Sequence, residues 1–227
     1  MSKSMKIEVP KKVLDSVYGS TPEDWHQHAN GGGWVYKTAT VETSAYIGPS
    51  ATVYGSATVR YYATVRDYAW VGGSATVYGS ASVCGSASVR DYAMVSGSAQ
   101  VSGSAMVRDS ATVSDYATVS DYAWVGGSAS VGDSATVRGS AQVSGSAWAT
   151  SPLYIQGSKH SVTMCSRTEL QIGCKRGTFQ WWKDNAVKVG KAEGYTAAEI
   201  KEYLRIIYFA ARMAKYLPPE PTRKEEA

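Results

Sequence analysis

The run GSASVRDYAMVSGSAQVSGSAMVRDSATV, from Gly85 to Val113, has almost no variety, and its regularity decides the fold. Valine returns at every sixth residue, and an alanine stands two places before each valine. Outward from this run, every sixth residue from Val35 to Val143 is Val or Ile, and no insertion breaks the period. A short fixed period indicates a repeat architecture in which each unit packs on its neighbours.

The repeated hexad reads V-x-(G/D)-(S/Y)-A-x. A period of six fits neither a helix, at about 3.6 residues per turn, nor a plain alternating strand. It fits a short strand with Val pointing inward, followed by a tight corner. Gly or Asp at the third position tolerates left-handed backbone angles, and Ala fits a narrow corner. Three such units close a triangle of about 18 residues, so we predict about six coils stacked roughly 4.8 Å apart.

The unbroken hexads from residue 34 to 149 resemble the hexapeptide repeat of left-handed parallel β-helix proteins, a superfamily best known from trimeric acyltransferases. The lead-in NGGGWVYKTATVETSAYIGPSATV, from Asn30 to Val53, resembles hexapeptide proteins found in phages and prophages. The resemblance implies left-handed winding, a homotrimer and a phage-derived protein. It implies no particular activity, because one fold hosts many functions.

Two flanks depart from the hexad and complete a mainly β fold of three parts. Residues 1–33 are predicted to form an N-terminal cap in which Ser20-Thr21-Pro22-Glu23-Asp24 begins a short helix. Residues 34–149 form the β-helix, and residues 150–227 form a small α/β domain. In that domain LYIQG, SVTMC and LQIGC predict two or three strands, and residues 179–190 predict a helix. The capping box Thr196-x-x-Glu199 begins a second helix, running to about Leu217.

Composition narrows the classes of function. The net charge is +4, with the excess of positive charge after residue 150 too diffuse to indicate duplex nucleic acid. The N-terminus lacks the apolar core of a signal peptide, and no apolar run is long enough for a membrane span. The three cysteines form neither a disulfide framework nor a zinc pattern. We therefore expect a cytoplasmic protein, in the host cytoplasm if phage-encoded, with no membrane partner.

Catalysis has little support in the sequence. Acyltransferases of this fold commonly use a histidine and a loop thrown out of the coils, and the hexads contain neither. The chain has only His26, His28 and His160, and pairing His160 with Cys165 or Cys174 leaves no third orienting group. We therefore predict a non-enzymatic protein with no catalytic residue, metal or cofactor. An acyltransferase-related enzyme is the alternative.

Folding the repeat into columns locates the informative residues, because residues 18 apart lie above one another. On one face the position before Val reads Trp34, Thr52, Trp70, Ser88, Met106, Trp124 and Gln142. The position after Val reads Tyr36, Tyr54, Gly72, Arg90, Arg108, Gly126 and Ser144. The corner leading into this face carries Tyr68 and Tyr122. Large outward aromatics are thus concentrated on one face, with two stacked arginines midway.

An exposed aromatic stripe on a polar solenoid predicts a partner, and two interpretations stay open. The first partner is another copy of the chain, since aromatics and Arg favour trimer interfaces. The second is a planar anionic ligand, nucleotide-like, stacked on the rings and paired with the arginines in a cleft between subunits. The predicted ligand-binding residues are Trp70, Trp124, Tyr68, Tyr122, Arg90, Arg108, Tyr54 and Met106.

Our functional hypothesis is a homotrimeric binding protein that sequesters such a ligand, and the resemblance to phage proteins suggests a host defence signal that a phage must remove. The second alternative is a phage structural part in which the prism is a rigid spacer and the C-terminal domain holds a protein partner.

Overall fold

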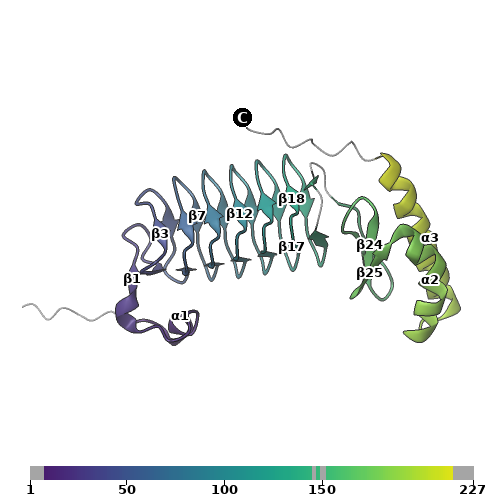
Figure 1. Cartoon of the computed structure of the whole chain (residues 1–227), viewed down its shortest axis with the longest axis horizontal. Coiled ribbons are helices and arrows are strands. Elements are labelled where there is room, and N and C mark those ends of the chain that lie inside the picture. The colour runs from purple at the N-terminus through teal and green to yellow at the C-terminus, as the bar shows by residue number, and fades with distance from the viewer. Residues whose placement is uncertain (1–7, 145–146, 149–151, 217–227) are drawn as a thin grey trace, which may run out of the picture.

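The computed structural model describes residues 8–144, 147–148 and 152–216. The repeat region is a parallel β-solenoid of about six triangular coils, with a short helix near its N-terminal end and a helix-and-sheet domain at its C-terminal end (Figure 1). The predicted fold class is therefore confirmed. Within the solenoid each strand pairs with the strand three places along the chain, in parallel and in register.

The three faces of the prism are three parallel sheets. Face 1 consists of β2 (Trp34–Tyr36), β5 (Thr52–Val53), β8 (Trp70–Val71), β11 (Ser88–Val89), β14 (Met106–Val107), β17 (Trp124–Gly126) and β20 (Gln142–Ser144). Face 2 consists of β3 (Thr40–Val41), β6 (Thr58–Val59), β9 (Thr76–Val77), β12 (Met94–Val95), β15 (Thr112–Val113), β18 (Ser130–Val131) and β21 (Ala147–Trp148). Face 3 consists of β4 (Tyr46–Ile47), β7 (Thr64–Val65), β10 (Ser82–Val83), β13 (Gln100–Val101), β16 (Thr118–Val119) and β19 (Thr136–Val137).

The core of the prism is built from the two fixed positions of the hexad. Every hexad valine from Val53 to Val143 is fully buried, and the corner alanines from Ala45 to Ala141 are at most 1% exposed. Burying a valine side chain contributes roughly 1.5–3 kcal/mol relative to leaving it in water. The sequence is therefore monotonous because every coil buries Val and Ala at the same positions.

The third hexad position turns the corner, as predicted. Asp67, Asp91, Asp109, Asp115 and Asp121 all adopt left-handed φ angles between 59° and 62°. All five of these carboxylates also accept a hydrogen bond from the backbone N–H of the residue 18 places later, at 2.9–3.3 Å. Asp is thus more than a tolerated corner residue, because its side chain ties each coil to the next.

The N-terminal cap follows the prediction in part. Thr21 begins a short helix and forms a capping box with Asp24, but this helix is a single 3-10 turn, η1 (Pro22–Asp24). The chain then forms β1 (Trp25–Gln27), which pairs antiparallel with β2 and covers the edge of face 1. The chain continues as a strand here because it pairs with β2: the backbone N–H of Lys37 donates to the carbonyl of Asp24, and the Asp24–Lys37 ion pair at 2.7 Å joins the same two segments. A helix that the sequence did not indicate, α1 (Lys11–Leu14), precedes this turn.

The C-terminal part contains four antiparallel strands, one more than the sequence indicated: β22 (Tyr154–Gln156), β23 (Ser161–Met164), β24 (Glu169–Ile172) and β25 (Lys175–Thr178). Helix α2 (Phe179–Ala192) and helix α3 (Ala197–Met213) follow, with a short η2 turn (Ala214–Tyr216). The sheet lies between the last coil and the helices (Figure 1). The capping box at Thr196 and Glu199 is present, while the predicted helix end at Leu217 lies outside the described residues.

Among the described helices, none combines the length and the apolar character needed to cross a bilayer.

Candidate functional site

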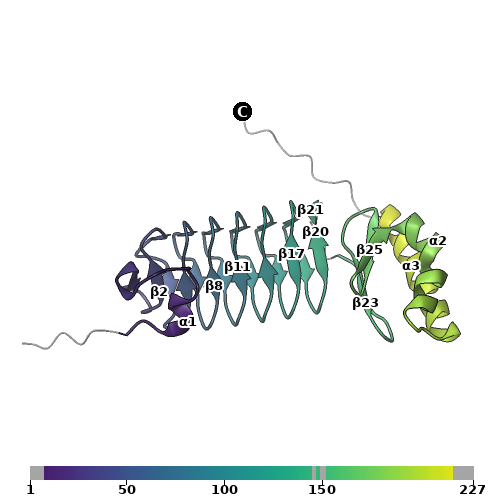
Figure 2. The same ribbon diagram turned by 60° about the horizontal axis from the view of Figure 1, so that its bottom comes forward.

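The open part of face 1 runs over strands β8, β11, β14 and β17 (Figure 2). The strand register places Trp70, Ser88, Met106 and Trp124 opposite one another in consecutive strands, as the column analysis predicts. Arg90 and Arg108 follow the buried valine of the two middle strands. We call this surface, from Trp70 to Trp124, the aromatic–arginine bay.

Side chains of the bay contact one another diagonally between coils. The Tyr54 ring meets the Trp70 ring edge-on, with ring centroids 6.1 Å apart. Two coils further, Nη2 of Arg90 lies 3.3 Å from Sδ of Met106, and one coil beyond that, Cζ of Arg108 lies 4.8 Å from the centroid of the Trp124 ring. Each partner is 16 residues along the chain, one coil on and two positions back. The arginines are therefore held flat against apolar neighbours rather than extended into solvent.

Two glycines make room for the rings. A Cβ atom on Gly72 would lie 2.2 Å from Cζ of Tyr54, and a Cβ atom on Gly126 would lie 2.4 Å from Cζ2 of Trp124. The two rings thus lie over the backbone at these glycines. The Tyr-Trp-Gly units that the sequence repeats 54 residues apart owe their glycine to this close approach.

The electrostatics of the bay favour an anion. Among the described residues, Arg90 forms no ion pair with a carboxylate, and Nε of Arg108 lies 3.8 Å from Oδ2 of Asp109, too far for a hydrogen bond. The neighbouring carboxylates of Asp91 and Asp109 accept backbone N–H groups of the next coil. Within the same described part of the chain, Nε of both arginines and Nε1 of Trp124 are shielded from solvent and lack a hydrogen-bond partner.

Tyr54 is kept neutral by its surroundings. Burial raises the pKa of its phenol, and the positive charge of Arg90 partly opposes that rise. Tyr54 therefore presents an uncharged ring to the edge of the bay at physiological pH.

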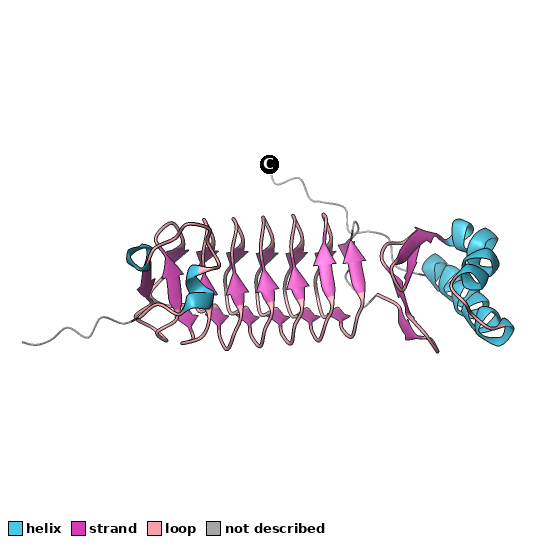
Figure 3. Ribbon diagram, turned by 90° about the horizontal axis from the view of Figure 1, so that it is seen from below, coloured by secondary structure: helices cyan, strands magenta, loops and turns pink. Residues whose placement is uncertain are grey.

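The N-terminal end of the aromatic stripe is not open, which the column analysis did not anticipate. Trp34 is 5% exposed and packs with Val9, Val13 and Trp25, while Tyr36 and Tyr54 lie against this cluster. Helix α1 lies over the first coils of face 1 (Figure 3), and Nζ of Lys12 is 4.5 Å from the centroid of the Tyr68 ring. The missed signal was the group of apolar residues in the N-terminal segment that packs with Trp34: Val9, Val13, Leu14 and Val17.

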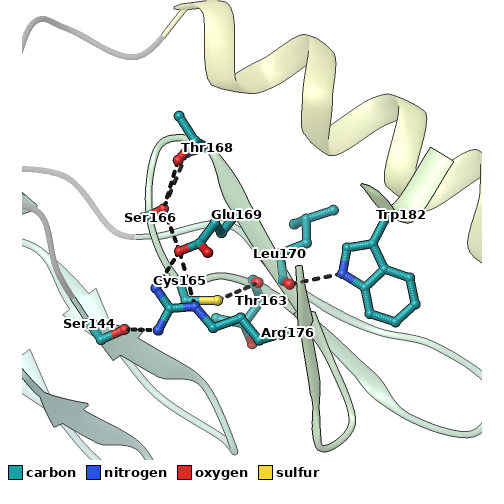
Figure 4. A network of polar contacts seen from close by, with 9 residues as sticks. All are labelled: Ser144, Thr163, Cys165, Ser166, Thr168, Glu169, Leu170, Arg176 and Trp182. Atoms are coloured by element: carbon teal, nitrogen blue, oxygen red, sulfur yellow. Dashed lines mark hydrogen bonds and ion pairs between the residues drawn. The ribbon is translucent and has the colours of Figure 1, made fainter. Parts of the chain in front are cut away.

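The other end of the bay meets the C-terminal domain. A guanidinium nitrogen of Arg176 donates to Oγ of buried Ser144 at 2.5 Å, and the same guanidinium pairs with Glu169 (Figure 4). The backbone N–H of Ser144 also bonds to the carbonyl of Cys165 at 3.2 Å. The bay is thus bounded by the cap at one end and by this junction at the other.

The predicted corner residues sit at the margin of the bay. Tyr68 and Tyr122 are 58% and 77% exposed, and both precede a face 1 strand. Tyr122 makes no ring contact among the described residues, whereas Tyr68 contacts Lys12. Both tyrosines are free to approach a ligand or a second chain from the side.

The histidines and cysteines lie outside the bay, and His160 and Cys174 line the same cavity of the C-terminal domain. His26 is exposed on β1, His28 is buried with Nδ1 3.2 Å from the carbonyl of Asn30, and His160 lies in the C-terminal domain. Burial raises the pKa of the Cys165 thiol to about 11. In the part of the chain that the structure describes, no cluster of three or more His, Cys, Asp or Glu residues is arranged to hold a metal ion.

By fold, the chain belongs to the class of parallel β-solenoids with an appended α/β domain. Comparison with known protein families found no match. Comparisons with curated proteins and with solved structures likewise found none.

Proposed function

We propose that this protein is a non-catalytic binding protein whose aromatic–arginine bay captures a planar, negatively charged, nucleotide-like small molecule. The observation that carries the proposal is the position of Arg90 and Arg108. Both are packed beside apolar side chains, and neither has a carboxylate within hydrogen-bonding distance among the described residues. An arginine in such surroundings binds an anion more strongly than one in open water.

The dimensions of the bay support a ligand of nucleotide size. Trp70 and Trp124 lie three strand spacings apart, about 14 Å. Stacking of a base on an aromatic side chain contributes about 1–3 kcal/mol. Trp70, Trp124 and the marginal tyrosines supply ring faces, and the arginines between them supply the positive charge.

The assembly we propose is a homotrimer with the bay at the boundary between copies, supported by the resemblance of the hexads to trimeric β-helix proteins. The lead-in from Asn30 to Val53 supports a phage-derived protein acting inside the host cell. Capture without turnover would lower the free concentration of the ligand. Removal of a host defence signal is the role that fits such capture.

Calorimetric titration with adenosine monophosphate and with uncharged adenosine tests the proposal. The doubly substituted Arg90→Gln/Arg108→Gln variant should lose at least ten-fold in affinity for the monophosphate and little for adenosine, because only the phosphate pairs with the guanidinium groups. Arg138→Gln is the matched control, since Arg138 holds the same hexad position on face 3. Equal affinity of both variants for the monophosphate would refute anion capture in the bay.

A second pair of variants separates ligand binding from self-assembly. Trp70→Ala and Trp124→Ala should abolish nucleotide binding and leave the oligomeric mass unchanged. Dissociation into single chains would identify the aromatic stripe as an interface between copies instead.

A further inference from the structure

A cavity of about 50 Å³ lies in the C-terminal domain, apart from the bay. Its lining comes from the β24–β25 hairpin, from α2 and α3, and from the turn that carries His160. Ile172, Trp182, Ala186 and Ile207 form a buried apolar floor.

The polar tips of the large aromatic residues in the floor are already engaged. Nε1 of Trp182 donates to the carbonyl of Leu170 at 2.9 Å (Figure 4). The Tyr203 hydroxyl accepts from the backbone N–H groups of Lys159 and His160 and donates to the carbonyl of His160 at 2.8 Å. Both side chains therefore present only ring carbons to the cavity, which suits an apolar occupant.

One polar ring atom of His160 is left for a ligand at the rim. Nδ1 of His160 lies 2.5 Å from the Tyr195 hydroxyl, and a Cβ atom on Gly173 would lie 2.8 Å from Cδ2 of the His160 ring, so the ring is held from two sides. Burial raises the pKa of Tyr195 to about 12. Nε2, the other nitrogen of the His160 ring, has no hydrogen-bond partner among the described residues.

The charges at the rim are balanced. Nζ of Lys175 lies 3.2 Å from Oε1 of Glu193, and both residues border the cavity. An ion pair at the mouth favours neither an anion nor a cation. The rim therefore selects an uncharged ligand that can form one hydrogen bond.

We propose that this cavity binds a small, uncharged, cyclic or branched molecule that carries one hydroxyl group. A cavity needs about 10–15 Å³ of such volume for each water-sized group, so 50 Å³ holds about three to five non-hydrogen atoms, and the rest of a ring lies at the mouth. The inserted edge of the ring lies on the apolar floor, and the hydroxyl forms a hydrogen bond with Nε2 of His160. This site is independent of the bay, so either can fail without the other.

Methyl NMR of the full chain, titrated with phenol and with toluene, tests the proposal. Saturable shifts confined to the methyl groups that line the cavity are expected with both probes, with phenol binding several-fold more tightly because only phenol offers an oxygen; these are the methyl groups of Ile172, Ala186, Val189, Ile200 and Ile207. Absence of saturable shifts at 10 mM probe, about the weakest affinity reasonable for a seven-atom ligand, would overturn the proposal.

Two variants locate the site. Ala186→Leu fills the cavity and should abolish the shifts, whereas Val187→Leu, on the exposed side of the same helix, should leave them unchanged. His160→Phe keeps an aromatic ring at the rim and should remove only the preference for phenol over toluene. Retention of that preference in His160→Phe would refute the role of Nε2.

Discussion

Asp109 stabilises a corner of the solenoid and also lies beside Arg108 of the bay. Removing its carboxylate should therefore lower the stability of the fold and raise the affinity for an anionic ligand. Its φ angle is 60°, its Oδ2 accepts from the N–H of Gly127 at 2.9 Å, and the same oxygen lies 3.8 Å from Nε of Arg108. Asp109→Gly keeps the left-handed corner without strain but loses the hydrogen bond, a net cost of about 0.5–1.5 kcal/mol. Asp109→Ala loses the same hydrogen bond and keeps a Cβ in the left-handed region without the polar side chain that helps Asp adopt it, so it should be about 1–2 kcal/mol less stable than Asp109→Gly.

Anion binding should improve in the same variants. Two charges 3.8 Å apart interact by about 1 kcal/mol in water, and exposure and salt reduce this to roughly 0.5–1 kcal/mol. Removing the carboxylate frees Arg108 from that competitor, so affinity for adenosine monophosphate should rise about two- to five-fold.

Urea unfolding followed by circular dichroism, together with calorimetric titration, measures both effects. Asp115→Gly is the matched control: it has a φ angle of 59° and bonds to the N–H of Asp133 at 3.2 Å, but it lies at a corner away from face 1. It should lose similar stability with unchanged affinity. Equal stability of the Gly and Ala variants at residue 109 would refute the corner argument, and weaker nucleotide binding by Asp109→Gly would refute the competition.

Two further predictions concern packing and thiol chemistry. Gly72→Ala should lower the free energy of unfolding by about 1–3 kcal/mol, because the new methyl group displaces the Tyr54 ring. Gly132→Ala is the control and should cost less, since the nearest atoms to its new methyl group are 3.2 Å away. Equal melting temperatures for the two variants would contradict this prediction. At pH 8 a thiol reagent should modify exposed Cys174 quickly and buried Cys165 only on unfolding, because a pKa of about 11 keeps the Cys165 thiol protonated. Mass spectrometry of the labelled peptides measures the two rates. Equal rates would contradict the burial of Cys165.

The solenoid was predictable because the packed core requires Val and Ala at fixed positions in every hexad, and this requirement produces the period of six. The columns of face 1 followed from the same period, so Trp70, Met106 and Trp124 align as expected. The diagonal contacts could also have been predicted from the sequence, by comparing residues 16 apart. A simple column count hides them, because it compares residues 18 apart.

The cap and the C-terminal domain were less predictable because tertiary contacts decide them. The turn at Thr21 carries good helix signals, yet the following residues pair with β2 and continue as a strand. Strand β25, with the sequence KRGT, has no apolar alternation and forms because β24 supplies its backbone partners. Covering of Trp34 by the N-terminal segment likewise depends on a contact between distant parts of the chain.

The most direct test of ligand capture is native mass spectrometry of the assembly purified without denaturation from the cells that produce it. The wild-type protein should show the mass of three chains plus a small molecule that heating releases with the ultraviolet absorption of a nucleobase, and Arg90→Gln/Arg108→Gln should show three chains alone. A bare mass for the wild-type protein, or the same bound molecule in the double variant, would contradict capture by the aromatic–arginine bay.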